Sequence, residues 1–205
     1  MTGNTNRTVY LQDGDALVVN DVQDCFLPGG SLGVQSGDEV IAPLNKAILI
    51  FQRLELPIFF TRDWHPADHC SFQQQGGPWP VHCLADTEGS DFAADLIVPE
   101  NRVIISKGTD RNYEEYSSFR GRDYQGVMLS EHLEQLKVRR VFIGGLATDY
   151  CILNSVIDLR NVGYEVFVLI DGVRAVNVKP DDEEKALNKM RRIGAEFVDS
   201  SSLQE

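Results

Sequence analysis

Basic residues are scarce in this chain of 205 residues, which has 19 Lys and Arg against 31 Asp and Glu and a formal net charge of −12. Nucleic acids and anionic lipid surfaces are bound mainly through Lys and Arg, so we expect neither a nucleic-acid nor a membrane partner. Long hydrophobic runs are also lacking, because no stretch approaches the roughly 18 to 20 apolar residues of a membrane span. Residues 1–7 are polar and predict no secretory leader, so we expect a cytoplasmic protein.

Cysteine is infrequent as well. The four cysteines fall at irregular spacings, in a chain long enough to build a core without crosslinks: Cys25, Cys70, Cys83 and Cys151. This usage argues against a secreted disulfide framework, and we expect all four thiols to be reduced. The composition of 42% hydrophobic and 24% charged residues is that of an ordinary globular chain, and we expect one domain over residues 1–205.

Apolar segments rich in Val, Ile and Phe alternate with segments of helical periodicity, which is typical of α/β proteins. The expected strands cover 16–20, 57–61, 102–106, 140–144, 165–170 and 196–198. The expected helices cover 38–54, 129–136, 150–161 and 181–193. We therefore predict a three-layer α/β/α domain with a mostly parallel open sheet of about six strands.

Polar, reactive side chains follow four of the expected strands. Asp21 comes after the first strand, Asp63 and His65 after the second, Lys107 after the third, and Cys151 a few residues beyond the fourth. Because parallel strands present their carboxyl ends along one edge of the sheet, we expect these side chains to meet in one cleft.

Cys151 lies in a glycine-punctuated turn at the start of an expected helix, where the positive helix N-terminus lowers a thiol pKa. Asp21 is the candidate acceptor of its proton, and Lys107 the candidate stabiliser of the thiolate. Each of the three also has a structural interpretation: a buried small side chain for Cys151, a turn residue for Asp21 and a solvated strand end for Lys107. Their combination favours a nucleophilic site.

A long irregular segment, 64–92, holds three of the four histidines. Asp63 and His65 are two residues apart in extended chain and point to one side, and His82 can complete an open metal site. A structural zinc site made from Cys70, Cys83 and the histidines is the competing metal hypothesis, and a hydrogen-bonded loop without metal is the third. The aromatic side chains of Phe26 and Trp79 are candidate walls of a flat pocket, with core packing as the alternative, and Tyr116 and Phe119, beyond Lys107, are weaker candidates.

Five segments together resemble the nicotinamidases of the isochorismatase-like cysteine hydrolases. They are 21–30 (DVQDCFLPGG), 61–66 (TRDWHP), 79–83 (WPVHC), 107–108 (KG) and 145–151 (GLATDYC), and the resemblance spans roughly residues 16–198. It implies an isochorismatase-like, Rossmann-like fold. It also implies hydrolysis of nicotinamide, or analogues such as pyrazinamide, to the acid and ammonia through a cysteine thioester, within NAD salvage.

The resemblance further implies roles for individual residues. The catalytic triad would be Asp21, Lys107 and Cys151. A divalent ion, zinc or else iron or manganese, would be held by Asp63, His65 and His82. A cis peptide between Leu146 and Ala147 would direct the backbone N–H groups of Ala147 and Cys151 at an oxyanion. Substrate contacts would come from Phe26, Trp79, Leu146 and Tyr116.

One departure from the family pattern lies in the first segment, where Asp24 and Cys25 replace the usual Asn-Asp pair. Three alternatives therefore stay open at this point: another amide or ester hydrolase of the superfamily, a non-catalytic binding protein, and a thiol redox protein that uses Cys25 and Cys151. The oligomeric state is open too, a homo-oligomer included.

Overall fold

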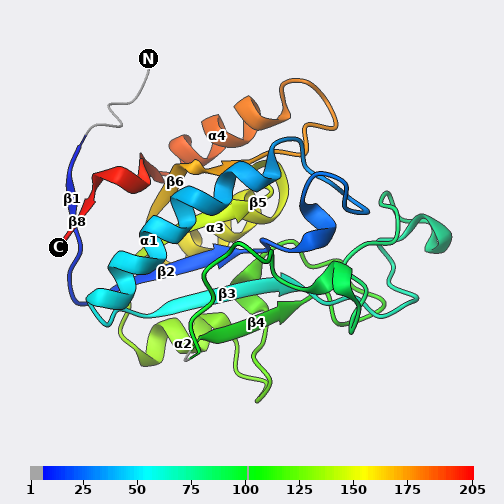
Figure 1. The fold of residues 1–205 in the computed structure, drawn as a ribbon, viewed down its shortest axis with the longest axis horizontal. Helices are drawn as coiled ribbons and strands as arrows, with labels where there is room; N and C mark the ends of the chain where they lie inside the picture. The colour runs from blue at the N-terminus through cyan, green and yellow to red at the C-terminus, as the bar shows by residue number, and fades with distance from the viewer. Residues whose placement is uncertain (1–6, 101) are drawn as a thin grey trace.

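The chain folds around one six-stranded sheet, shown in Figure 1 from a computed structural model that describes residues 7–100 and 102–205. All neighbouring strands are parallel, in the order β4-β3-β2-β5-β6-β7. The strands are β2 (Asp15–Asn20), β3 (Ile58–Asp63), β4 (Val103–Lys107), β5 (Arg140–Leu146), β6 (Glu165–Arg174) and β7 (Glu196–Val198). A separate two-stranded parallel pair, β1 (Val9–Tyr10) with β8 (Leu203–Gln204), was not expected from the sequence.

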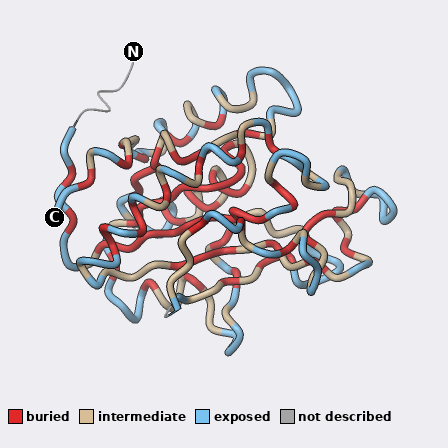
Figure 2. Tube along the Cα trace, in the orientation of Figure 1, coloured by how far each residue is buried: buried red, intermediate tan, exposed pale blue. Residues whose placement is uncertain are grey.

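Helices cover both faces of the sheet, which confirms the predicted three layers. One face packs against α1 (Ile41–Arg53), and the other against α2 (Leu129–Gln135), α3 (Leu153–Asn161) and α4 (Asp182–Arg192). Successive residues of a strand point to opposite faces, so Leu17 and Val19 join the core under α1 while Val18 joins the core of the other layer. Figure 2 shows buried residues concentrated along the central strands.

The helix boundaries differ from the sequence prediction at two places. A 3₁₀ turn at Gly37–Val40 precedes α1, and a π-helical turn at Thr148–Ile152 precedes α3. In that turn the N–H of Ile152 reaches back five residues to the carbonyl of Ala147. Such π turns are rare and concentrate at functional sites, and this one contains Cys151.

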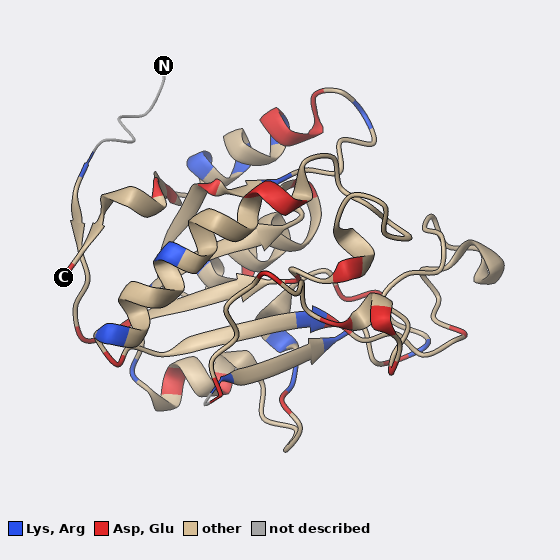
Figure 3. Cartoon of the chain, viewed as in Figure 1, with Lys and Arg blue, Asp and Glu red and all other residues tan. Residues whose placement is uncertain are grey.

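The strand order reverses direction between β2 and β5, and ligands of open α/β sheets bind beyond the carboxyl ends at this point. In Figure 1 the arrowheads of β2, β3 and β4 point toward the long irregular segment that follows β3. Figure 3 shows that charged residues are largely absent from the strands except near their ends. No helix among the described residues is long and apolar enough to cross a membrane.

Candidate active site

The carboxyl ends of four strands bring the predicted reactive residues together. Asp21 follows β2, Asp63 and Lys107 are paired as the last residues of β3 and β4, and Cys151 lies in the turn after β5. All four are buried, and Asp21 and Lys107 are completely so. Burial of four ionisable groups is costly unless they neutralise one another, so their mutual contacts decide the chemistry.

The ammonium group of Lys107 is the centre of this cluster. Its Nζ lies 2.9 Å from Asp21 Oδ2 and 3.4 Å from Cys151 Sγ, and it donates a short hydrogen bond to Asp63. Burial alone would lower the pKa of Lys107, but the charges of Asp21 and Asp63 outweigh it and raise that pKa well above the usual value. Lys107 therefore stays charged.

Asp21 is held by hydrogen bonds on both of its carboxylate oxygens. Thr61 Oγ1 donates to Oδ1 at 2.6 Å and Asn20 Nδ2 donates to Oδ2 at 2.9 Å. Burial raises the pKa of Asp21, the charge of Lys107 partly offsets this rise, and the charge of Asp63 adds a smaller rise. A raised pKa makes this carboxylate a better proton acceptor.

The thiol of Cys151 differs from the sequence expectation. Burial raises its pKa well above the usual value, although Lys107 opposes the shift. The prediction that the helix N-terminus lowers this pKa is therefore wrong for the structure described here, because desolvation of a thiolate exceeds that local dipole effect. Nucleophilic use of Cys151 thus requires a proton acceptor, and oxygen of Asp21 lies within 4.8 Å of Sγ.

Asp63, His65 and His82 bring one potential ligand atom each within 4.8 Å of the others. His65 Nδ1 donates to the carbonyl of Gly108 at 2.9 Å, and His82 Nδ1 donates to the carbonyl of Pro80 at 2.8 Å. These bonds fix the tautomer that leaves each Nε2 lone pair free, as metal-binding histidines require. Burial lowers the pKa of His82 to about 4, so this ring is neutral at pH 7. The donor set fits a divalent ion such as zinc, iron or manganese.

Gly108 leaves the space that the imidazole ring of His65 occupies. Its φ is +63°, and a Cβ at this residue would lie 2.3 Å from His65 Cε1. A side chain here would displace the imidazole, so the glycine directly after Lys107 is needed for the ligand geometry.

The hypothesis of a structural zinc site made from Cys70, Cys83 and the histidines is not supported, because Cys83 is bonded to Cys25. Within the part of the chain that the structure describes, Cys70 belongs to no group of clustered ligand atoms. His69 stacks on His65 at 4.1 Å between ring centroids, and its ring nitrogens contact Ser71 Oγ and the carbonyl of Tyr113. It supports His65 from outside the ligand set.

A cavity of about 30 Å³ opens beside Cys151. Trp79 Nε1 donates to the hydroxyl of Tyr116 at 3.0 Å, and the ring of Tyr150 lies 5.0 Å from that of Trp79. Burial raises the pKa of Tyr116 to about 12, so its hydroxyl stays protonated. The lining residues are Phe26, Leu32, Asp63, Trp79, His82, Glu114, Tyr116, Ala147, Tyr150, Cys151 and Val176.

Four lining residues were not singled out from the sequence: Leu32, Glu114, Tyr150 and Val176. Tyr150 directly precedes Cys151, which is a signal that could have found it. Glu114 carries a pKa raised by burial and by the charge of Asp63, but its sequence neighbourhood gives no such signal. Val176 is held by its backbone N–H, which donates to Asp149 Oδ1.

Leu146 lies elsewhere than the other expected substrate contacts. Its side chain is fully buried in the core under α1 and is absent from the cavity lining. The alternation along β5 explains this position, because Leu146 points toward the same face as Phe142. The peptide bond between Leu146 and Ala147 is cis, as the resemblance implies.

Cys25 and Cys83 form a disulfide, which corrects the expectation that all four cysteines are reduced. Cys70 and Cys151 are free. The pairing joins residues 58 positions apart, and sequence spacing could not reveal it because the two loops meet only at the carboxyl edge of the folded sheet. The hypothesis of a redox pair between Cys25 and Cys151 is not supported, since Cys25 is bonded to Cys83.

Comparison with known proteins agrees with this geometry. The model of the isochorismatase domain matches residues 15–202. The chain belongs to the isochorismatase family. Among the family's curated members, the nicotinamidase of Escherichia coli is 32% identical, with 93% of this chain and 97% of that protein covered.

Two solved structures of this family are similar in both sequence and fold. The pyrazinamidase of Pyrococcus horikoshii, solved in complex with zinc, is 41% identical, with a TM-score of 0.82 and coverage of 91% of this chain and 99% of that one. PnC1 from L. infantum, in complex with nicotinate, is 32% identical, with a TM-score of 0.85 and coverage of 96% and 98%.

Proposed function

We propose that this member of the isochorismatase family is a metal-dependent nicotinamidase, which hydrolyses nicotinamide to nicotinate and ammonia and accepts analogues such as pyrazinamide. The observation that carries the proposal is the sharing of Asp63 between the buried cluster of Asp21, Lys107 and Cys151 and the ligand group of His65 and His82. Relatives named as nicotinamidases and pyrazinamidases, one of them solved with zinc, support it. In this role the enzyme would serve NAD salvage.

The aromatic walls of the cavity suit a flat heteroaromatic amide. Phe26 and Trp79 would pack on the ring, with Tyr116 and Tyr150 beside Trp79 in the cavity lining. A divalent ion held by Asp63, His65 and His82 would supply a Lewis acid for the ring nitrogen. With the ring so placed, the carboxamide would face Cys151.

Acylation begins with proton transfer from the thiol of Cys151 to Asp21, whose raised pKa suits it as the acceptor. The sulfur then forms a bond to the amide carbon, and the carbonyl oxygen takes the negative charge. The ammonium of Lys107, 3.4 Å from Sγ, stabilises the thiolate as it forms. The backbone N–H groups of Ala147 and Cys151 would donate to the oxyanion.

Collapse of that intermediate breaks the carbon–nitrogen bond. Asp21 returns its proton to the leaving nitrogen, so ammonia departs and a thioester remains on Cys151. Asp21 is then ionised again and can take a proton from a water molecule that attacks the thioester. The carbon–sulfur bond then breaks, Asp21 returns the proton to the sulfur of Cys151, and the acid leaves the restored thiol.

Ammonia release from nicotinamide by the purified protein tests this function. We expect turnover that chelation abolishes and zinc, iron or manganese restores, and that Cys151→Ser removes. The matched control is Cys70→Ser, because Cys70 is the other free cysteine and lies outside the cavity lining. Folded, metal-loaded protein that releases no ammonia from nicotinamide or pyrazinamide would contradict the proposal and favour another amide of the same superfamily.

A further inference from the structure

The Cys25–Cys83 disulfide connects the two loops that build the candidate active site. Its Cα atoms are 5.6 Å apart, and both residues are 1% exposed. Cys25 lies in the short turn after β2, and Cys83 lies in the irregular segment after β3. Neither sulfur has a part in the reaction described above, so the bond calls for a different role.

Each cysteine is the direct neighbour of a residue of the site. Cys25 precedes Phe26, a wall of the cavity, and Cys83 follows His82, a candidate metal ligand. The rings of Phe26 and His82 are 5.8 Å apart. One covalent bond therefore restrains the separation between the aromatic wall and the imidazole.

His82 is the ligand with the weakest support from regular structure. Asp63 ends β3, where the side chain of Gln23 holds its backbone N–H and C=O, and His65 follows two residues later. Among the described residues, the His82 side chain makes one hydrogen bond, to the carbonyl of Pro80, two residues away in the same loop. The position of His82 Nε2 therefore depends on the contacts that hold this loop in place.

Cys83 links that loop to the rest of the ligand set. Its carbonyl accepts the backbone N–H of His65 at 3.1 Å. Its φ of +41° lies in the left-handed region, which a residue with a side chain adopts at a cost and keeps only where its surroundings hold it. The bond to Cys25 is such a restraint, beside the contact with His65.

We propose that the Cys25–Cys83 disulfide positions His82 for metal binding, so that metal affinity depends on the oxidation state of this pair. The inference rests on the proposed function for the metal site. The oxidised form carries the sulfur–sulfur bond. A dithiol reductant breaks it by thiol–disulfide exchange: two electrons and two protons pass to the protein sulfurs, two thiols form, and the reductant becomes a disulfide. The loop that carries His82 is then held in place only by noncovalent contacts.

The first measurement establishes the bond itself. Protein purified without reductant is denatured and alkylated with a maleimide, and its mass is compared with that of a sample reduced beforehand. We expect two adducts without reduction, on Cys70 and Cys151, and four after it. Four adducts in the unreduced sample would overturn the inference.

The second measurement is zinc affinity in competition with a chromogenic chelator, using the metal alone and no substrate. We expect Cys25→Ser, Cys83→Ser and the double variant to share one dissociation constant, about tenfold or more above that of the oxidised wild type, a loss typical of groups that orient metal ligands. Each single change removes the same bond, so the effects do not add. Cys70→Ser is the matched control and should leave the affinity unchanged.

Wild type reduced with a phosphine, and verified by four adducts, separates the bond from the packing of the sulfurs. It should show the weakened affinity although no atom has been replaced, and circular dichroism checks that it remains folded. Cys25→Ala provides a second variant if serine at this buried position prevents folding. Additive effects of the serine variants, with a reduced wild type that binds zinc as tightly as the oxidised one, would overturn the inference.

The two proposals fail in different ways. Nicotinamide hydrolysis with a zinc affinity that ignores the disulfide would overturn only the role of Cys25 and Cys83. Absence of zinc binding in every form, together with absence of hydrolysis, would overturn the metal site and this inference with it.

Discussion

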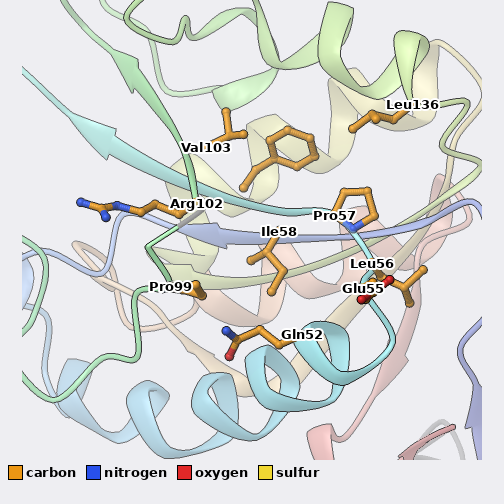
Figure 4. Close-up of a pocket in the computed structure, with 10 residues that line it drawn as sticks. Gln52, Glu55, Leu56, Pro57, Ile58, Pro99, Arg102, Val103 and Leu136 are labelled. Atoms are coloured by element: carbon orange, nitrogen blue, oxygen red, sulfur yellow. The ribbon is translucent and has the colours of Figure 1, made fainter.

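The two ends of the central sheet differ in what they bury. The carboxyl end has a cavity of about 30 Å³ beside buried Asp21, Asp63, Lys107 and Cys151. The amino end has a groove of about 500 Å³ between the end of α1 and the starts of β3 and β4, shown in Figure 4. Its wall is formed by Leu56, Pro57, Ile58, Phe59, Val103 and other residues, with Glu55 and Arg102 as its charged members.

Volume and chemistry are therefore separated in this molecule. The large groove holds no cluster of ligand or nucleophilic atoms among the described residues, whereas the small cavity adjoins both clusters that the structure contains. Burial of ionisable groups costs free energy of desolvation, and clusters of such groups are found mainly at active sites. Concentration of such groups identifies the site better than the size of the hollow does.

The largest expected difference between the two ends comes from removing a buried charge. Lys107→Met leaves Asp21 and Asp63 without their cation, so we expect it to abolish activity and to lower the free energy of unfolding by about 3 to 5 kcal/mol. Arg102→Met at the groove should change stability little. Urea denaturation measures the free energy of unfolding of both variants. Equal losses in the two variants would contradict the expected difference between the two ends of the sheet.

Acid should weaken the carboxyl end through His82. Burial lowers its pKa in the folded protein to about 4 from 6.5, so between these values the unfolded chain binds more protons. The metal-free protein should therefore lose stability as pH falls from 6.5 to 4, by about 3 kcal/mol in total from this group. Denaturation of wild type and His82→Asn across this range tests it, and an unchanged slope in the variant would contradict it.

A smaller effect is expected from a polar side chain that supports Asp63. Gln23 accepts the N–H of Asp63 at 2.8 Å and donates to the carbonyls of Asp63 and Ser90 at 2.9 Å. Gln23→Leu leaves these buried groups unpaired, and we expect a loss of about 1 to 3 kcal/mol. The same substitution at exposed Gln52, in the groove, is the control, and similar thermal unfolding of both variants would count against the role of Gln23.

The smallest effect should come from the groove itself. Leu136→Ala and Gln52→Ala alter residues that line it, and we expect kcat/KM for nicotinamide to change by less than about twofold, because activity depends on the distant site. A larger change in steady-state kinetics would show that the amino end communicates with the cavity and would remove the distinction between the two.

Much of the fold follows from local patterns. Short apolar segments separated by helical periodicity predicted the six strands and four principal helices, and the rule for parallel strand ends placed Asp21, Asp63, Lys107 and Cys151 together. These inferences work because they depend on chain direction and side-chain period, which are local properties. The β1 and β8 pair was missed because two-residue strands carry no period.

Other features depend on distances that only the folded chain sets. The Cys25–Cys83 bond spans 58 residues, and Glu114 reaches the cavity from a loop without any expected motif. The burial of Cys151 reverses the direction of pKa change that its position in a helix turn indicated. The exclusion of Leu146 from the cavity depends on which face of β5 it occupies.

Asp63 has two roles. One of its oxygens contacts Lys107, and its carboxylate also belongs to the ligand group of His65 and His82. A redesign of this protein for another metal therefore has to keep both roles of Asp63. A neutral residue placed at position 63 for its coordination preferences also removes one of the two carboxylate charges that keep Lys107 ionised. Metal selectivity and the chemistry of the nucleophile therefore cannot be changed independently. A change at the metal ligands has to be accompanied by a change that restores the charge balance around Lys107.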